Sequence, residues 1–340
     1  MTKAKVLVTG ASGFIALHCI DQLLKAGYTV RGTLRTMSRE SDVRDALSES
    51  SDALEFAYTD LMEDEGWNEA AQGCDYVLHI ASPVPLTEPK HEDELILPAR
   101  DGKLRVLRAC REAGVKRVVM TSSSVVMMAG HEAHKGHTFS ETDWADADDK
   151  HVAAYPKSKI IAERVAWDFV NAEEGPELSV INPGAVLGPL LSPTFSITGN
   201  IIRQLMIKDM PAVPRFGINM IDVRDIAEAH IIAMTHPEAV GQRYLCCSDH
   251  IWLSEIASIL SKKYSAEGWQ IPTKTLPDLV VRVGSLFNPV LKRIKPLLGS
   301  VYQVDNTKIR GLLGRELRSH EDTLIAMADS MIALGVVKKE

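Results

Sequence analysis

The sequence contains few aromatic residues, no extended apolar segment and no concentration of positive charge. Only 6% of its residues are aromatic, and 38 Lys and Arg stand against 45 Asp and Glu, which gives a formal net charge of -7. Because the sequence has no Lys/Arg-rich run, we expect no positively charged surface of the kind that binds nucleic acid. No stretch reaches the roughly 18 to 20 apolar residues that a membrane-spanning helix needs, so we expect no membrane partner either.

Cysteine and histidine give no sign of a disulfide framework or a metal site. The cysteines are odd in number and scattered, and several lie in apolar segments where a free thiol behaves as a small apolar side chain. His131, His134 and His137 are three positions apart and would lie on one face only in a helix. The neighbouring glycines indicate a loop, so no metal is expected. The segment before Val6 is too short for a signal peptide, and we expect a cytoplasmic location. The five cysteines are Cys19, Cys74, Cys110, Cys246 and Cys247.

Short apolar runs alternate with helical patterns through the first half of the chain. Between the first two runs, Ile15, Cys19 and Leu23 recur at the spacing of one helix face, and Gly27 supplies a stop. Such alternation predicts an α/β fold, with a Rossmann-type doubly wound parallel sheet covered by helices on both faces. The expected strands are 5–8, 29–34, 54–58, 76–80, 117–120 and 178–181.

The regularity weakens from about residue 187, where prolines divide the pattern into short pieces. We expect residues 1–186 to form the dinucleotide-binding Rossmann domain, and 187–217 with 248–340 to form a smaller, mostly helical substrate lobe. Residues 221–230 have the pattern of a strand leading into a helix. The segment 218–247 is therefore expected to return to the main sheet.

The first expected strand ends in a glycine-rich turn that opens a helix. Small residues let the backbone approach a phosphate, and the exposed N–H groups and the helix dipole stabilise its negative charge. The spacing Gly-x-x-Gly-x-x-Ala differs from the common fingerprint but keeps two glycines in the turn and a small residue at the contact between helix and strand. We expect a dinucleotide to bind here, with contacts from Gly10, Ser12, Gly13, Phe14 and Ile15.

The second expected strand indicates which dinucleotide binds. A site for NAD carries an acidic residue about 20 positions beyond the glycines, at the end of this strand, and none is present. The strand is followed by Arg35, and a guanidinium binds phosphate bidentately. We predict that Arg35 contacts the 2′-phosphate of NADPH, with Arg31 and Arg39 as candidate helpers. Asp60, after the third strand, is expected to accept a hydrogen bond from the adenine amino group or to cap a helix.

Two further motifs have the residues for carbonyl chemistry. Serines 122–124 follow an expected strand, and Tyr155 and Lys159 stand four apart at the start of a helix. Positions i and i+4 share one helical face, so both side chains can project into one cleft. A nearby ammonium favours the phenolate and makes the phenol a usable acid. A strand-end serine can hold a carbonyl oxygen while hydride arrives at carbon and Tyr155 supplies the proton.

With these motifs in this order, the chain resembles the extended short-chain dehydrogenase/reductases, and within them the dihydroflavonol-reductase-like group of aldehyde and ketone reductases. The resemblance covers residues 4 to about 245. It is carried by the segments 8–15, 27–35, 60–61, 79–83, 121–123, 155–159 and 182–186.

The resemblance implies a Ser-Tyr-Lys triad in which Lys159 also bonds the nicotinamide ribose. The position of Thr121 places the family's serine at Ser123, with Ser122 and Ser124 as alternatives. The sequence departs from the family pattern at Asp101, where many relatives have Asn. This difference counts against a proton relay through a water molecule held by a side-chain amide. The resemblance also implies cofactor contacts from Leu61 and a nicotinamide pocket lined by Ala81, Ser82, Pro83, Pro183 and Val186.

The second lobe carries no charged cluster that would dictate a substrate. Its apolar residues, among them Phe195, Phe216 and Ile221, favour an uncharged, aromatic or branched carbonyl compound.

The sequence as a whole predicts an NADP-dependent oxidoreductase. We expect it to reduce an aldehyde or ketone to an alcohol by hydride transfer from NADPH, with Tyr155 as proton donor, as a monomer or homodimer acting on a small molecule. One alternative is an NAD-dependent nucleotide-sugar epimerase/dehydratase or a hydroxysteroid-type dehydrogenase, because the same triad serves those reactions; Arg35 counts against it. The other is a non-catalytic NADP-sensing protein, against which the presence of both Tyr155 and Lys159 counts.

Overall fold

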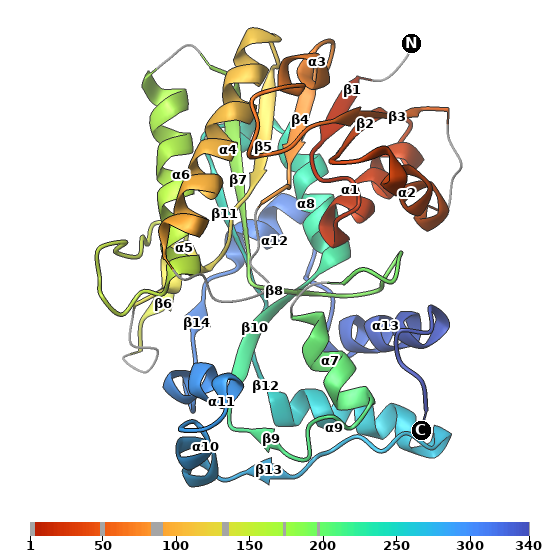
Figure 1. The fold of residues 1–340 in the computed structure, drawn as a ribbon, viewed down its shortest axis with the longest axis vertical. Coiled ribbons are helices and arrows are strands. Elements are labelled where there is room, and N and C mark those ends of the chain that lie inside the picture. Colours follow the sequence, from red (N-terminus) through yellow and green to blue (C-terminus); the bar gives the residue numbers. More distant parts are fainter. Residues whose placement is uncertain are drawn as a thin grey trace.

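A seven-stranded parallel sheet forms the larger part of the fold (Figure 1). The computed structural model describes residues 4–47, 52–82, 91–130, 136–172, 175–195 and 198–339. The strand order β11-β7-β5-β4-β1-β2-β3, with every pair parallel, confirms the predicted Rossmann-type sheet. The strands are β1 (Lys5–Val8), β2 (Thr29–Leu34), β3 (Leu54–Tyr58), β4 (Tyr76–His79), β5 (Arg117–Thr121), β7 (Glu177–Pro183) and β11 (Arg243–Cys246).

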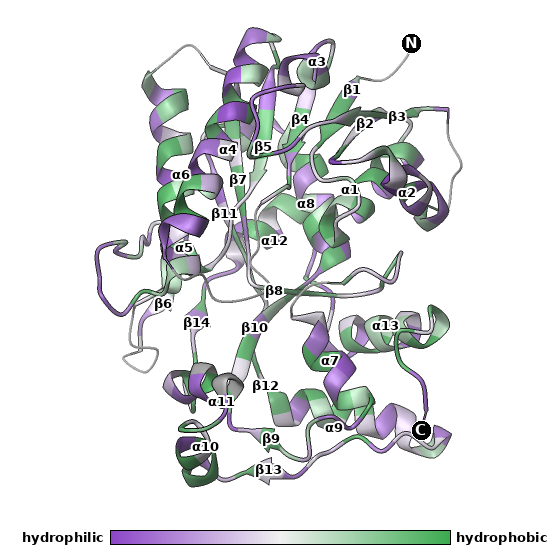
Figure 2. Ribbon diagram, viewed as in Figure 1, coloured by the Kyte–Doolittle hydropathy of each residue, from purple (hydrophilic) through white to green (hydrophobic). Residues whose placement is uncertain are grey.

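Helices cover both faces of this sheet. On one face, α1 (Phe14–Lys25) packs against α8 (Val223–Thr235), and on the other α4 (Asp93–Glu112) packs against α6 (Ala154–Ala172). Alternate residues of a strand therefore enter different cores: Val119 packs on the α1 side, whereas Val118 and Met120 pack on the α4 side. The green and purple bands that alternate along α4 in Figure 2 are those of a helix that buries one face.

A smaller lobe lies at the carboxyl ends of the strands, in the lower half of Figure 1. Its centre is a three-stranded sheet of β8 (Ala185–Leu187), β10 (Gly217–Asp222) and β12 (His250–Trp252). Two short pairs flank it, β9 (Val213–Pro214) with β13 (Thr275–Leu276), and β6 (Thr138–Phe139) with β14 (Gln303–Val304). Its helices are α7 (Gly199–Met206), α9 (Leu253–Tyr264), α10 (Asp278–Gly284), α11 (Pro289–Ile294) and α13 (His320–Ala333).

The segment 218–247 divides between the two lobes. Its helix α8 packs on the main sheet and its strand β11 pairs with β7, but β10 pairs with β8 and β12 instead. The expectation that the strand at 221–225 returns to the main sheet is therefore wrong for β10. An apolar run shows that a strand is buried but does not show which strand it pairs with.

The remaining elements are short. None of the helices in the described ranges has the length and apolar character needed to cross a membrane. All five cysteines are free and buried. The remaining helices are α2 (Glu40–Ala46), α3 (Trp67–Ala71), α5 (Val125–Met128) and α12 (Thr307–Leu313), with 3-10 turns at Met37–Arg39, Pro237–Ala239, Ser265–Glu267 and Lys295–Leu297.

Candidate active site

The residues selected from the sequence follow the carboxyl ends of neighbouring strands. Gly10 comes after β1, Arg35 after β2, Asp60 after β3, Ala81 after β4 and Ser123 after β5. Because parallel strands end at the same edge of a sheet, the fold brings these positions together at the edge where open α/β sheets bind ligands.

The glycine turn is built so that backbone can come close to a ligand. Gly10 has a φ of +71°, and the N–H of Gly13 closes the turn on the carbonyl of Gly10 at 2.8 Å. No side chain caps α1, and its first turn has no acidic residue, so its leading N–H groups are free to bind a phosphate. The side chain of Phe14 is buried, so Phe14 can contact a cofactor only through its backbone.

The glycine turn packs closely against β2, and Gly32 leaves the space for this contact. A Cβ at Gly32 would lie 2.7 Å from the Cβ of Ala11, so a side chain at that position would push the turn away from β2. Two hydrogen bonds hold the turn against β2, from Ala11 N to Thr33 O at 2.9 Å and from Gly10 N to Thr33 Oγ1 at 3.1 Å. The turn is thus fixed before any ligand arrives.

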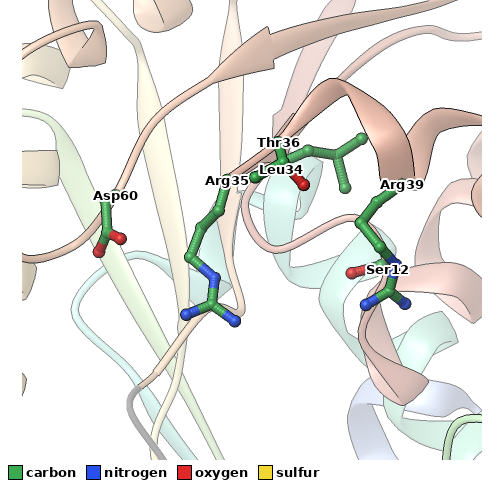
Figure 3. Close-up of a pocket in the computed structure, with 6 residues that line it drawn as sticks. All are labelled: Ser12, Leu34, Arg35, Thr36, Arg39 and Asp60. Carbon is green, nitrogen blue, oxygen red and sulfur yellow. The ribbon is translucent and has the colours of Figure 1, made fainter.

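A pocket of about 390 Å³ lies beside this turn and contains two arginines (Figure 3). Arg35 is exposed, projects into the pocket between Asp60 and Ser12, and forms no hydrogen bond or ion pair with any residue that the structure describes. The Nε of Arg39 forms an ion pair with Asp42 at 2.7 Å. One Asp60 oxygen accepts from Met62 N at 3.0 Å. The pocket is lined by Ser12, Leu34, Arg35, Thr36, Arg39 and Asp60.

Arg31 does not help Arg35, which corrects the expectation from the sequence. Its Nε donates to Glu55 Oε1 at 2.7 Å, and its Nη1 donates to the carbonyls of Ala70 and Gln72 at 2.8 Å each. These bonds tie β2 to β3 and to the end of α3. The Arg31 guanidinium is therefore a structural cross-link, and its position in the middle of β2 keeps it away from the glycine turn.

Tyr155 and Lys159 lie on the first turns of α6 and face the same edge of the sheet. The Lys159 Nζ lies 5.5 Å from the centre of the Tyr155 ring and donates to Ser82 Oγ at 2.7 Å. Lys159 is buried and Tyr155 is half-buried. The structure thus brings together the strand-end residue Ser82, the ammonium and the phenol.

The three serines after β5 differ in exposure. The side chains of Ser122 and Ser124 are buried, and their N–H groups donate to the carbonyls of Ile181 and Pro183 on β7, each at 2.8 Å. Ser123 lies between them and is half-buried. Of the three residues, Ser123 is the most exposed.

A buried histidine and threonine fix the end of β4. Thr9 Oγ1 accepts from the N–H groups of Ile80 and Ala81 at 3.0 and 2.9 Å, so its own hydrogen is left to donate to His79 Nδ1 at 2.9 Å. Burial, with Lys103 and Lys159 nearby, holds the pKa of His79 well below its usual range, so the ring is neutral. Sequence reasoning assigned neither side chain, although both lie within the segments that carry the resemblance.

The helix α4 presents a lysine, not an amide, to the sheet. Asp101 accepts from Arg100 Nε at 2.7 Å, and this bond lowers the pKa of its carboxyl. The buried Lys103 donates to Thr121 O at 3.1 Å, and its pKa lies well below the usual range because of burial and the charge of Lys159. Position 101 therefore has no side-chain amide that could hold a water molecule for a proton relay.

The remaining predicted cofactor residues differ in where they lie. Leu61 is half-buried and packs against Gly102 of α4. Pro183 is buried at the end of β7, and Val186 is buried in β8 as part of the core. Pro83, with His131 and His134, lies outside the described residues.

A second pocket, of about 180 Å³, lies between the serine turn and the smaller lobe. Sequence reasoning identified Phe216 as a residue of this lobe but missed Met128, Asn219 and Tyr302, which come from segments far apart in the chain. Ile221, suggested with Phe216, is buried in the core instead. No described residue of the lining is charged; these residues are Ser124, Met128, Ala185, Phe216, Gly217, Ile218, Asn219, Leu297, Ser300 and Tyr302.

Comparisons with known proteins extend over both lobes. Residues 6–247 match the model of the NAD dependent epimerase/dehydratase family. Tetraketide alpha-pyrone reductase 1 of Arabidopsis thaliana is 32% identical over 339 residues, which are 98% of this chain and 97% of that protein. Dihydroflavonol 4-reductase of Zea mays is 32% identical over 279 residues, 77% of this chain and 75% of the relative. The crystal structure of yeast methylglyoxal/isovaleraldehyde reductase Gre2 complexed with NADPH is similar with a TM-score of 0.82 and 27% identity, over 98% of this chain and 100% of that chain.

Proposed function

Because the chain belongs to the NAD dependent epimerase/dehydratase family, as an oxidoreductase of the extended short-chain type, we propose that it reduces an uncharged aldehyde or ketone to an alcohol with NADPH. One observation carries the proposal: the half-buried Tyr155 and Ser123 lie at the sheet edge that also carries the glycine turn, with the Lys159 ammonium 5.5 Å from the phenol ring. The similar reductases named above support it at the level of the family.

The residues present fit a phosphorylated dinucleotide. The N–H groups at the start of α1 suit a pyrophosphate, and the Arg35 guanidinium, which has no partner among the described residues, suits a 2′-phosphate. Asp60 has a second carboxylate oxygen available for the adenine amino group. NADPH, when bound, supplies the hydride. An NAD site would need an acceptor where Arg35 stands.

The chain's own groups then act on the carbonyl oxygen. We assign the Ser123 hydroxyl as the donor that holds this oxygen, and Tyr155 as the acid that protonates it while negative charge develops. Lys159 stabilises the phenolate that remains, because its ammonium is buried beside the ring and Ser82 fixes it there. The backbone of Ile80 and Ala81 is held by the hydroxyl of Thr9, which fixes this edge of the pocket.

The second pocket supports an uncharged substrate. A charged substrate buried there would find no opposite charge among the described lining residues to offset its loss of hydration, whereas Phe216 and Met128 provide apolar contact. The Tyr302 hydroxyl can bond a distal hydroxyl or keto group, and Asn219, whose Nδ2 already donates to Ser248 O and Tyr302 O, can accept from a hydroxyl through Oδ1. That the protein acts on a free small molecule in the cytoplasm, as a monomer or homodimer, remains a prediction from the sequence.

The proposal is tested by following NADPH and NADH oxidation against aldehydes, ketones, flavanonols and sugar nucleotides. We expect turnover with uncharged carbonyl compounds, and a kcat/KM at least about tenfold higher with NADPH than with NADH, because a phosphate contact contributes about 1.5–3 kcal/mol. Turnover confined to sugar nucleotides would show that the epimerase or dehydratase alternative is correct. Binding of NADPH without turnover of any compound would favour the sensing protein.

The choice among the three serines gives a second expectation. Ser123→Ala should lower kcat by about 100-fold, the loss typical for one donor to a developing oxyanion. Ser122→Ala is the matched control, because it removes a neighbouring buried hydroxyl, and its kcat should stay within about threefold of the unmodified enzyme. If Ser122→Ala or Ser124→Ala caused the larger loss of kcat, the assignment of Ser123 would be wrong.

A further inference from the structure

Asn182 joins the serine turn to the helix that carries the phenol. It is fully buried in β7, and its Nδ2 donates to Glu163 Oε2 at 2.7 Å and to Ser123 O at 3.4 Å. An amide nitrogen has two hydrogens, and each has an acceptor here. Since both neighbours can only accept, the orientation of the amide is determined by the contacts.

Backbone hydrogen bonds hold the serine turn against the part of β7 that contains Asn182. The N–H groups on either side of Ser123 donate to the carbonyls on either side of Asn182, namely Ser122 N to Ile181 O and Ser124 N to Pro183 O, at 2.8 Å each. The carbonyl of Ser123 also accepts from Val126 N at 3.1 Å. The Asn182 side chain therefore adds a direct link from the carbonyl of Ser123 to Glu163 on α6.

Glu163 is the other end of that link. It stands one helical turn after Lys159 and two turns after Tyr155 on α6, and it is 1% exposed. Its Oε1 accepts from Arg243 Nε at 2.6 Å, and Arg243 Nη1 donates to the carbonyls of Glu141 and Asp143. A buried carboxylate held from two sides cannot move without leaving a charge unpaired, which is strongly unfavourable.

We propose that Asn182 is a positioning residue for Ser123, and that Glu163 sets its place relative to the helix of Tyr155 and Lys159. The inference rests on the proposed function, in which the serine and the tyrosine act on the same oxygen. Two groups that act on one atom must keep their separation, and a displacement of about 1 Å can cost about 100-fold in rate. The link through Asn182 spans the two elements that carry them.

The test is a double-mutant cycle on Asn182 and Ser123. Asn182→Ala should lower kcat by about 10- to 100-fold, with KM and the Kd for NADPH within about threefold, because the cofactor site is untouched. In the Ser123→Ala background, the same change should lower kcat by no more than about twofold, since a residue that acts through Ser123 has nothing left to position. Asn182→Leu, which keeps about the size of the side chain but has no donor, should behave like Asn182→Ala.

A matched control distinguishes positioning from loss of stability. Ser179 lies on the same strand, is fully buried, and donates from Oγ to Ala239 O at 2.6 Å. Ser179→Ala should lower the melting temperature and leave kcat within about twofold. Should Asn182→Ala melt too low for assay, Asn182→Ser keeps one donor and supplies the same cycle.

The outcomes separate the two proposals. A kcat for Asn182→Ala within threefold of the unmodified enzyme, or losses that multiply in the double variant, would overturn the role of Asn182 while leaving the reductase function in place. An unmodified chain that reduces no carbonyl compound, or a Ser123→Ala variant with full activity, would overturn the catalytic assignment itself.

Discussion

Replacing Tyr155 by Phe is expected to lower kcat for carbonyl reduction by about 1,000-fold while the Kd for NADPH changes by no more than about threefold. The substitution removes the proton that the alkoxide needs, and a positioned general acid contributes about 100- to 10,000-fold. The ring itself remains, so the ammonium of Lys159, 5.5 Å from its centre, keeps its surroundings. Steady-state kinetics and fluorescence titration with NADPH measure the two quantities separately.

Tyr76→Phe is the matched control for this substitution. Tyr76 begins β4 at the opposite edge of the sheet from the site, so loss of its hydroxyl should leave both kcat and NADPH affinity unchanged. A Tyr155→Phe variant that reduces carbonyl compounds at a comparable rate would show that another group supplies the proton.

Replacing Arg35 by Ala is expected to raise the Kd for NADPH by about 10- to 100-fold and to change the Kd for NADH by no more than about threefold. The guanidinium projects into the pocket beside the glycine turn with no partner within the described chain, so its charge is available for a phosphate that NADH lacks. A hydrogen bond to a charged group contributes about 1.5–3 kcal/mol, which corresponds to this range. Isothermal titration with each dinucleotide measures both constants.

Arg31→Ala provides the comparison, because Arg31 lies in the strand that precedes Arg35 but donates to Glu55 and to the carbonyls at the end of α3. It should lower the melting temperature and leave the ratio of the two dissociation constants as it was. Equal losses of NADPH and NADH affinity in Arg35→Ala would show that Arg35 makes no contact with the 2′-phosphate.

The parts of the fold that sequence predicted are those determined by local pattern. The strands β1 to β5 and β7 of the main sheet, and the helix beginning near Tyr155, follow from short apolar runs and helical spacing, and the structure has them within a few residues. The gathering of Gly10, Arg35, Asp60 and Ser123 at one edge then follows from the geometry of parallel strands, without knowledge of any contact.

The parts that sequence did not predict depend on partners distant in the chain. Arg31 in β2 and Arg35 directly after β2 are the same residue type, but Glu55 and the carbonyls at the end of α3 engage Arg31 and not Arg35. The contact of Asn182 with Glu163 joins positions 19 apart through the packing of a helix on a sheet. Asn219 and Tyr302 meet because Asn219 Nδ2 donates to Tyr302 O at 3.1 Å, across 83 positions of sequence. The spacing of apolar residues along the sequence does not show which distant positions form such contacts.

The position of β11 has a consequence for synthesis of the chain. This strand completes the sheet beside β7, and it ends at Cys246, after the chain has passed through β8, α7 and β10 of the smaller lobe. A nascent chain that has reached residue 186 therefore exposes the unpaired backbone of β7, and an open strand edge is a template for association with other chains. About 60 further residues, up to the end of β11, must be synthesised before β11 can pair with β7.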